Sequence, residues 1–311
     1  MKKHSFRDAE AKCEATFSYN CDNWWHLYTP GKETPVIFQD DSDFRYSMNL
    51  MARCSTEFQE LVIVAFEIMN NHIHIVLAGE EEKIKEFFMA FRRRLVRYLS
   101  QNHYMKPFDC FQLRLKAIND LKTLRNTIVY VNRNGYVANP DHTPYSYPWG
   151  TGAYYFNTQQ YGFQNVKDMK DTDLRKLFHG RVPGNIERMQ VTNGMIAPSS
   201  YCSIQLGMSM FRDAHQYFSM LTKNVEAYSE LACELDDGEF LTDSELFAQL
   251  AKLLRTSYGV ANVQELTKSQ LVDTANKLHY DYHASNGQIR RLLGITQYEA
   301  DSLFPLSVKG Q

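Results

Sequence analysis

The sequence predicts an α+β protein, with an antiparallel sheet and helices in its first half and a mostly helical extension after it. Two β-rich runs, 61–68 and 72–79, are separated by a short break and indicate neighbouring strands. Apolar stripes at helical spacing cover 83–101 and 120–132. The chain has 311 residues, 44% of them hydrophobic, which is enough for more than one core. We therefore expect three regions: 1–160, a helical 161–235 and a helical 236–311.

The elements of the first half follow from local patterns. We expect extended segments at 13–20, 35–38, 61–68 and 72–79. We expect helices at 40–59, 83–101 and about 120–132. The residues 80–82 are acidic and suit the positive N-terminal end of the second helix. The resulting region is a layer of antiparallel strands covered by helices, ending near residue 160.

The second half is read more coarsely. Helical stretches in 161–235 alternate with the turn-rich segments GRVPGN and NGMIAPSS, and an acidic stretch at 230–239 is typical of a solvated linker. Residues 285–304 read as a short helix, a turn at Gly294 and a new helix capped by Thr296. That pattern suits a helix-turn-helix, although helical hairpins without any role in DNA binding share it.

Charge, cysteines and hydropathy narrow the class of protein. The formal net charge of −2 argues against a chain coated in positive charge, but it permits a local basic groove. The six cysteines form no C-x-x-C pair, so we expect reduced thiols rather than a zinc ribbon or disulfides. Without a signal-like apolar core or an apolar run of about 18 residues, we expect a soluble, cytoplasmic protein with no membrane partner.

The strongest local motif is His72-Ile73-His74 within the second β-rich run. Side chains alternate across a sheet, so His72 and His74 share a face while Ile73 and Ile75 point to the other. Two imidazoles placed in this way can chelate one divalent cation. Two histidines on the solvated face of a strand would give the same pattern.

A second candidate pair is Tyr130 and Asn134, four residues apart in the expected helix at about 120–132 if that helix continues. Residues at this spacing lie on one helical face. A phenol and a carboxamide one turn apart can present a nucleophile beside a third metal ligand. Taken alone, Tyr130 is more typical of a packed helix aromatic than of a nucleophile.

Basic residues concentrate around these groups. The run from 83 to 133 is rich in lysine and arginine, and only Glu86, Asp109 and Asp120 oppose them. This favours a groove for a phosphate backbone, although a charge run is also typical of a solvated surface. The candidate DNA-binding residues are Arg92, Arg93, Arg94, Arg97, Arg125 and Arg133.

Two segments together resemble the HUH single-strand DNA tyrosine transposases, and most closely the REP-associated tyrosine transposases. The first is Met69-Asn70-Asn71-His72-Ile73-His74-Ile75-Val76-Leu77, which is similar to the family's Met-Pro-Asn-His-x-His-Leu-Leu signature. The second is Tyr130-Val131-Asn132-Arg133-Asn134-Gly135, followed by Tyr147-Pro148-Trp149-Gly150-Thr151, which is similar to its Tyr-Ile-x-x-Asn-Pro and Tyr-x-Trp-Ser-Ser segments. The resemblance covers about residues 10–155.

The resemblance implies a ferredoxin-like or RRM-like sheet, the HUH nuclease fold, and a set of roles. His72 and His74 would be ligands of Mg²⁺ or Mn²⁺, Asn134 a third ligand, and Tyr130 the nucleophile that forms a 5′-phosphotyrosine. The implied partners are hairpin-forming single-stranded DNA and a second copy of the chain in a homodimer. Asn70, Gly135 and Gly150-Thr151 depart from the family's proline, proline and Ser-Ser. The residues Tyr98, Trp149, Tyr154 and Tyr155 could stack unpaired bases, or pack in the core.

Two other functions compete with cleavage. One is a DNA-binding regulator that keeps the fold, uses the basic helix and the 285–304 motif, and has lost catalysis. The other is an unrelated metalloprotein that uses the histidine pair for hydrolysis. The latter needs a further strong ligand, and strand parity predicts that Glu67 and Glu80 are poorly placed for that role.

Overall fold

The computed structural model describes most of the chain. The described residues are 6–20, 23–31, 34, 36–102, 108–138, 142–143, 145–157, 162–223, 231, 235, 241, 243–282, 284 and 286–304. The chain divides into two compact units. The first comprises 1–227 and 235–237, and the second comprises 228–234 and 238–311.

The first unit is built on a four-stranded antiparallel sheet. Its strands are β1 (Trp24–Tyr28), β2 (Val62–Ile68), β3 (Ile73–Ala78) and β4 (Arg114–Ile118). In the sheet they lie in the order β2-β3-β1-β4. The first strand in sequence, β1, therefore lies between β3 of the β2–β3 hairpin and β4. Helices connect β1 to β2 and β3 to β4, which gives two interleaved β-α-β units. This confirms the predicted α+β class and its antiparallel sheet.

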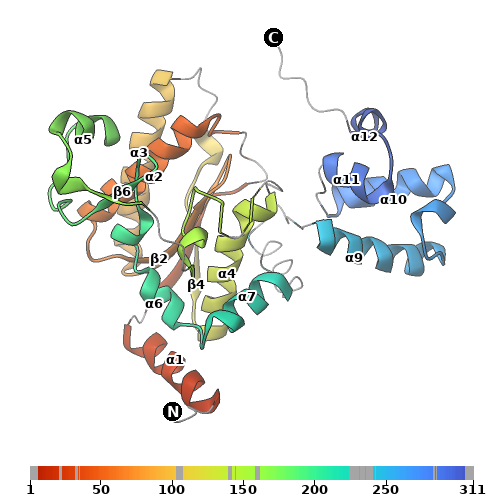
Figure 1. Cartoon of the computed structure of the whole chain (residues 1–311), viewed down its shortest axis with the longest axis horizontal. Helices are drawn as coiled ribbons and strands as arrows, with labels where there is room; N and C mark the ends of the chain where they lie inside the picture. Colours follow the sequence, from red (N-terminus) through yellow and green to blue (C-terminus); the bar gives the residue numbers. More distant parts are fainter. Residues whose placement is uncertain are drawn as a thin grey trace. The chain divides into compact units, whose positions relative to one another are not determined.

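Three helices flank this sheet within the first unit. They are α2 (Asp41–Glu57), α3 (Glu81–Asn102) and α4 (Leu121–Ala138). Figure 1 shows α2 and α3 together on one side of the strands and α4 on the other. Asp40 caps α2 by accepting hydrogen bonds from the backbone N–H groups of Ser42 and Asp43. Acidic Glu81 and Glu82 occupy the first turn of α3, as the sequence predicted.

The strand register separates the sheet into two chemically different faces. Tyr28 pairs with His74, and Glu67 pairs with His74 from the other side. Directly opposed residues of antiparallel strands point to the same face, so these three side chains lie together on the α4 side. The alternate residues Leu27, Phe66, Ile73 and Ile75 are buried on the face of α2 and α3.

Residues 162–223 belong to the first unit and complete it. They contain α5 (Asp171–Leu177), α6 (Ile204–Ser209), α7 (Ala214–Lys223) and a small sheet of β5 (Gln164–Asn165), β6 (Gln190–Thr192) and β7 (Met195–Ile196). Their apolar core includes Val166, Phe178 and Ile196 and contacts Ala52 of α2. The expected helical region therefore also contains strands, which are too short to produce a readable alternation.

The second unit is helical, as predicted. Its elements are α9 (Asp243–Leu253), a π-helical turn (Leu254–Tyr258), α10 (Lys268–Tyr280), α11 (Asn286–Leu293) and α12 (Gln297–Leu303). Gly294 has φ +67° between α11 and α12, a conformation that favours glycine. Thr296 caps α12 in a capping box with Glu299. The helix, glycine turn and capped helix predicted for 285–304 are confirmed.

The N-terminal prediction was wrong. Residues 13–20 are not extended but form the end of α1 (Phe6–Asn20), where Ala9, Ala11 and Ala15 favour a helix. Cys13 of this helix is buried, and Glu10 forms an ion pair with Arg125 of α4. The strands β1 and β4 were not predicted at all. Among the described residues, no helix combines the length and apolar character that a membrane span requires.

Candidate active site on the histidine face

His72 and His74 lie side by side at the start of β3. A tight turn precedes them, in which Met69 N donates to His72 O at 2.8 Å. The two imidazole ring centroids are 4.9 Å apart and the rings are nearly perpendicular. Both side chains are almost fully buried, with 2% and 0% of their surface exposed. The shared face that parity predicted for the pair is therefore present, but it is covered rather than solvated.

Tyr130 reaches this pair from α4. Its ring centroid lies 5.5 Å from that of His74, in an edge-to-face arrangement at 86°. The side chain is 2% exposed. Tyr130 is more than fifty residues away from the two histidines in sequence. The two imidazoles and the phenol thus meet between the sheet and α4.

A third histidine, His26, completes the cluster and was missed in the sequence. Its Nε2 lies 3.1 Å from Nδ1 of His74, and its ring centroid is 6.3 Å from that of Tyr130. Tyr28, two residues further on, stacks against His74 at 6.3 Å. The run Trp24–Tyr28 is almost continuously aromatic or apolar, so it lacks the alternation that identifies a half-buried strand. The sequence alone does not show that β1 pairs with β3, and this pairing places His26 beside His74.

The hydrogen bonds decide which imidazole atoms a metal could use. Nδ1 of His72 is 2.5 Å from Oδ1 of Asn71, and Nδ1 of His74 is bonded to His26. Ligation would therefore have to use Nε2 of each ring. Asn134 follows Tyr130 by one helical turn and is 3% exposed, and within the described residues its amide nitrogen has no hydrogen-bond partner. The described residues contain no group of three or more His, Cys, Asp or Glu arranged around a common metal position.

Glu67 is a buried carboxyl group on the same face, and the parity argument against it was wrong. It pairs directly with His74 across β2 and β3, and its Oε2 accepts a hydrogen bond from Gly135 N at 2.9 Å. Burial raises the pKa of Glu67 well above its ordinary value, and the bond from Gly135 opposes this only in part. The break at 69–71 is a tight turn between adjacent strands, which brings Glu67 opposite His74.

The segment 147–151 joins α4 to the edge of β2. Ile68 N donates to Trp149 O at 2.9 Å, and Thr151 N donates to Phe66 O at 2.9 Å. The Thr151 hydroxyl donates to Asn132 Oδ1 of α4 at 2.8 Å. A Cβ at Gly150 would lie 2.6 Å from Phe66 O, so only glycine fits this approach.

Gly135 serves the same junction from the helix side. A Cβ there would lie 2.2 Å from Cδ1 of Tyr147 and 2.6 Å from Oε1 of Glu67. The Tyr147 hydroxyl in turn donates to Ile68 O at 2.8 Å. Close packing around Glu67 thus explains why glycine stands at 135 and at 150.

The six arginines predicted to contact DNA have different environments. Arg93 and Arg97 are exposed on α3. Arg92 donates to the carbonyls of Phe108 and Phe111, and Arg94 pairs with Glu57. Arg125 and Arg133 are buried, so neither can reach a phosphate in this conformation. Arg125 is held by Met210 O and Glu10.

The four candidate stacking aromatics are largely used in packing. Tyr98 stacks on Tyr46 at 3.7 Å, and Trp149 stacks on Phe44 at 5.0 Å. Tyr155 is fully buried and donates to Val64 O. Tyr154 is half-buried. The rings of Tyr98, Trp149 and Tyr155 are therefore used in packing.

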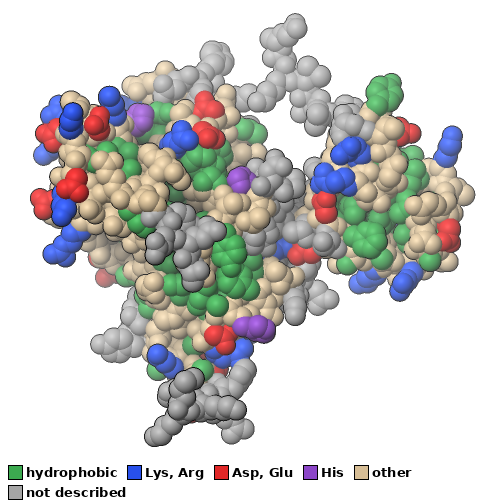
Figure 2. Space-filling view, in the orientation of Figure 1, with side chains coloured by type: hydrophobic (Ala, Val, Ile, Leu, Met, Phe, Trp, Pro, Cys, Tyr) green, Lys and Arg blue, Asp and Glu red, His purple; other side chains and the backbone are tan. Residues whose placement is uncertain are grey.

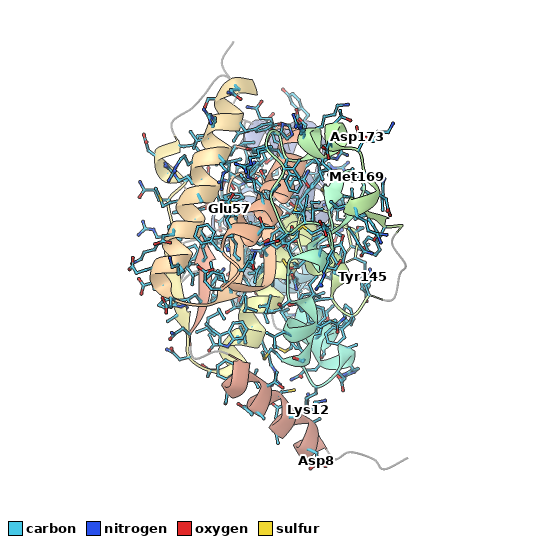
Figure 3. All side chains as sticks on the ribbon, turned by 90° about the vertical axis from the view of Figure 1, so that its left-hand side faces the viewer. Asp8, Lys12, Glu57, Tyr145, Met169 and Asp173 are labelled. Carbon is cyan, nitrogen blue, oxygen red and sulfur yellow. The ribbon has the colours of Figure 1, made fainter. Side chains whose placement is uncertain are left out.

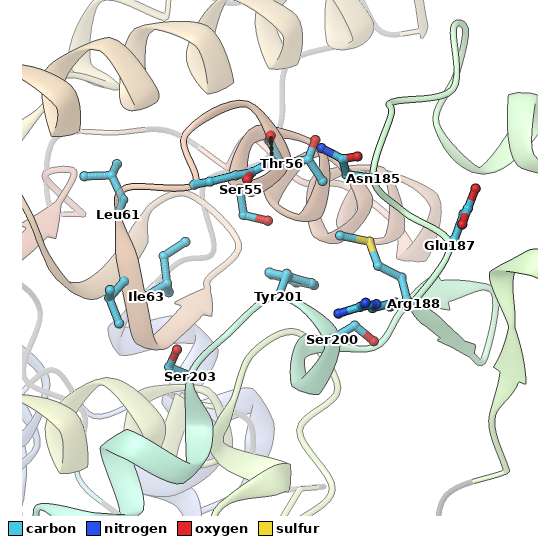
Figure 4. Close-up of a pocket in the computed structure, with 13 residues that line it drawn as sticks. Ser55, Thr56, Leu61, Ile63, Asn185, Glu187, Arg188, Ser200, Tyr201 and Ser203 are labelled. Atoms are coloured by element: carbon cyan, nitrogen blue, oxygen red, sulfur yellow. Dashed lines mark hydrogen bonds between the residues drawn. The ribbon is translucent and has the colours of Figure 1, made fainter.

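A separate hollow of 660 Å³ lies at the start of β2. Figure 4 shows Ser55 and Thr56 of α2, Ile63 of β2, and Tyr201 and Ser203 around it. Hydroxyl groups dominate its polar lining, and it contains no histidine or cysteine. Its charged lining residues are Glu187 and Arg188, and it shares no residue with the histidine cluster.

Comparisons with known proteins add no assignment. No protein-family model, no curated protein and no solved structure matches this chain.

Proposed function

We propose that this chain is a metal-dependent single-strand DNA transesterase, which cleaves and rejoins hairpin-forming DNA through a 5′-phosphotyrosine. The observation that carries the proposal is the meeting of His72, His74 and Tyr130 in one place. The interleaved β-α-β order of the sheet agrees with a ferredoxin-like core of the HUH type. The proposal includes hairpin DNA and a homodimer as partners.

The donors present suit a divalent cation such as Mg²⁺ or Mn²⁺. Two adjacent imidazoles would supply Nε2 atoms, and the buried carboxamide of Asn134 is the candidate for a third ligand. Its unsatisfied amide nitrogen is the kind of polar group that a rotation of the amide and a bound ion would account for. When bound, the cation would polarise the scissile phosphate.

The chain's own residues have distinct roles in this proposal. Tyr130 Oη attacks phosphorus, the bond from phosphorus to the 3′ oxygen breaks, and the leaving 3′ oxygen takes up a proton while the phenol loses one. Attack by a 3′-OH on the phosphotyrosine reverses the step without an external energy source. His26 is a positioning residue: if His74 Nδ1 carries the proton, its bond to His26 Nε2 leaves a lone pair on His74 Nε2.

Because the cluster is buried, the proposed cleavage requires neighbouring groups to move before DNA can enter. Because His72, His74 and Tyr130 are each at most 2% exposed, a phosphate can reach the Tyr130 hydroxyl only after neighbouring groups move. Burial also excludes water, which protects a phosphotyrosine from hydrolysis. We therefore expect cleavage to depend on binding of a cognate strand rather than on free access.

Covalent capture tests the proposal. Incubation with hairpin oligonucleotides bearing single-stranded flanks, in the presence of Mn²⁺, should yield a protein–DNA adduct that survives denaturing electrophoresis. Tyr130→Phe should reduce adduct formation by at least about 1,000-fold, because the nucleophile is removed. Tyr28→Phe is the matched control, because Tyr28 also contacts His74 and should retain the adduct.

The outcomes are distinct. An adduct that persists in Tyr130→Phe would assign the nucleophile elsewhere, with Tyr136 the next candidate; its side chain lies outside the described residues. No adduct with any hairpin, together with tight hairpin binding, would favour the second candidate function.

That second candidate is a non-catalytic DNA-binding regulator that keeps the transposase fold. Two observations favour it: the closed histidine cluster, and the α11–α12 pair with its glycine turn and capping box. The exposed Glu299 lies on α12, and its carboxylate would repel a phosphate backbone. Cleavage therefore remains the function that the site supports best.

A further inference from the structure

A second site lies on the other side of the sheet, among α2, α3 and the turn after α5. It is a hollow of 290 Å³ whose lining includes Arg53 of α2, Arg94 and Arg97 of α3, and Arg181. The histidine cluster faces α4 instead, so the sheet separates the two sites. Four guanidinium groups around one hollow are a dense positive charge in a chain whose net charge is −2 and which carries basic and acidic side chains interspersed on the face shown in Figure 2.

The positive charge of this arginine pocket is only partly neutralised. Glu57, labelled in Figure 3, pairs with Arg94 at 2.8 Å and with Arg53 at 3.6 Å. Within the described part of the chain, Arg97 and Arg181 have no carboxylate partner, and both are exposed. Two guanidinium groups are thus available to an anion from outside.

Aromatic rings pack together at and beside the pocket lining. Tyr46 and Tyr98 stack at 3.7 Å, and the ring of His179 meets both edge-to-face at 4.8 and 5.1 Å. His179 has φ +44°, a conformation that is costly for a residue other than glycine, and Gly180 follows with φ +141°. The strained turn at 179–180 sets the direction in which the chain leaves toward Arg181.

The cationic groups of the pocket lining are arginines rather than histidine. Burial lowers the pKa of His179 below its ordinary value, so this imidazole is neutral at neutral pH. Guanidinium groups match the geometry of phosphate oxygens, which they bind with two parallel hydrogen bonds. Phosphate, like carboxylate, is accordingly an anion that this lining fits.

The pocket continues into a second hollow. That hollow, of 510 Å³, shares Gly180 and Arg181 with the first and adds Arg175 and Asp171. Arg181 therefore belongs to both, and the two hollows follow one another along the surface. A track of this kind suits a chain of phosphates rather than one ion.

We propose that the arginine pocket binds the phosphodiester backbone of single-stranded DNA through Arg97 and Arg181. The identification of the ligand as DNA rests on the proposed function. The inference that the ligand is a chain of anionic groups rests on the arginine pocket itself. The pocket holds the strand at a site separate from the histidine cluster, so it contributes to binding and not to the chemical step.

Binding of an oligo-dT strand of about 20 nucleotides to the full chain tests this inference. The double variant Arg97→Ala/Arg181→Ala should weaken binding about tenfold at about 50 mM salt. The slope of log K against log salt should become shallower by about 1.4, because two contacts to a single strand are lost. The matched control is Arg188→Ala/Arg255→Ala, which removes two exposed arginines outside the pocket and should change binding less than about twofold.

Each outcome decides the inference. Equal weakening in both double variants would mean general charge attraction and would overturn it, as would unchanged binding in Arg97→Ala/Arg181→Ala. A polyglutamate of similar length that binds more tightly than DNA, with the same arginine dependence, would assign the pocket to acidic protein segments instead. Adduct formation through Tyr130 is scored separately: adducts with unchanged binding of the pocket variant would overturn this inference alone, and pocket-dependent binding without adducts would overturn the proposed chemistry alone.

Discussion

The two faces of the central sheet differ sharply although the same strands form both. On the side of α2 and α3, β3 presents Ile73, Ile75 and Leu77, all fully buried among apolar groups. On the side of α4, the same strand presents His74, and Glu67 and His26 lie on either side of it. These polar groups are as deeply buried as the isoleucines.

We infer from this difference that the apolar face contributes more to the free energy of unfolding than the polar face does. Apolar burial contributes roughly 25 cal/mol per Å², whereas burial of a carboxyl group or an imidazole costs free energy unless its hydrogen bonds are replaced. An apolar set of similar volume on the α4 side would fold at least as well. The proposed chemistry would give this cluster of imidazoles, phenol and carboxyl a reason to lie in that position.

Truncation of the apolar face should have the largest effect on stability. Ile75→Ala should lower the free energy of unfolding by about 3 to 4 kcal/mol, because it leaves a cavity in a fully packed layer. His72→Leu on the other face should change it by less than about 1.5 kcal/mol, since an apolar side chain replaces a polar one of similar volume. Tryptophan fluorescence during urea unfolding measures this, because Trp24, Trp25 and Trp149 all lie in the first unit.

An equal or larger loss in His72→Leu would contradict the comparison. It would mean that the histidine face stabilises the fold as much as the apolar face does. The cluster would then need no chemical task to explain it.

The elements around the site were predictable to the extent that they have a simple period. The α2, α3 and α4 helices and the β2–β3 hairpin followed from apolar spacing and from the break at 69–71. The strands β1 and β4 did not, because β1 is aromatic or apolar throughout and β4 carries Arg114 and Lys116 on a half-exposed edge. When a strand pairs with strands that are distant in sequence, its own residues give little indication of that pairing.

The site was predictable where its residues form a motif. His72, His74 and Tyr130 came from spacing and from the resemblance, and they lie together. His26 required the pairing of β1 with β3, and Glu67 required the register across the turn, which simple parity along one strand misjudged. The burial of Arg125 and Arg133 could not be predicted from the sequence, because the charge of a residue does not show where its side chain packs. Arg125 forms an ion pair with Glu10, and Arg133 is buried.

The junction between α4 and the polar face should be nearly as sensitive as the apolar layer. Gly135→Ala should lower the free energy of unfolding by about 2 to 3 kcal/mol, because the added methyl would overlap the Tyr147 ring and the Glu67 carboxyl. Gly184→Ala is the matched control: it has no atom within 4 Å of the new Cβ and should change stability by less than about 0.5 kcal/mol. Unchanged stability in Gly135→Ala would show that α4 can move away from β2 at little cost, which would make opening of the site easier.

The buried carboxyl should have the smallest effect near pH 5, and that effect should grow as pH rises. Because burial raises the pKa of Glu67, the folded chain holds a proton that the unfolded chain releases above about pH 4.5. This group's contribution is therefore fully present below that pH and is lost as pH rises, by about 1.4 kcal/mol per pH unit up to the folded pKa. Glu67→Gln removes that loss, so without added metal its stability relative to the wild type should increase with pH, as measured by urea unfolding between pH 5 and 8. The exposed Glu80→Gln should keep the wild-type slope. A parallel slope in Glu67→Gln and wild type would mean that the carboxyl is solvated, and with it the α4 side of the sheet.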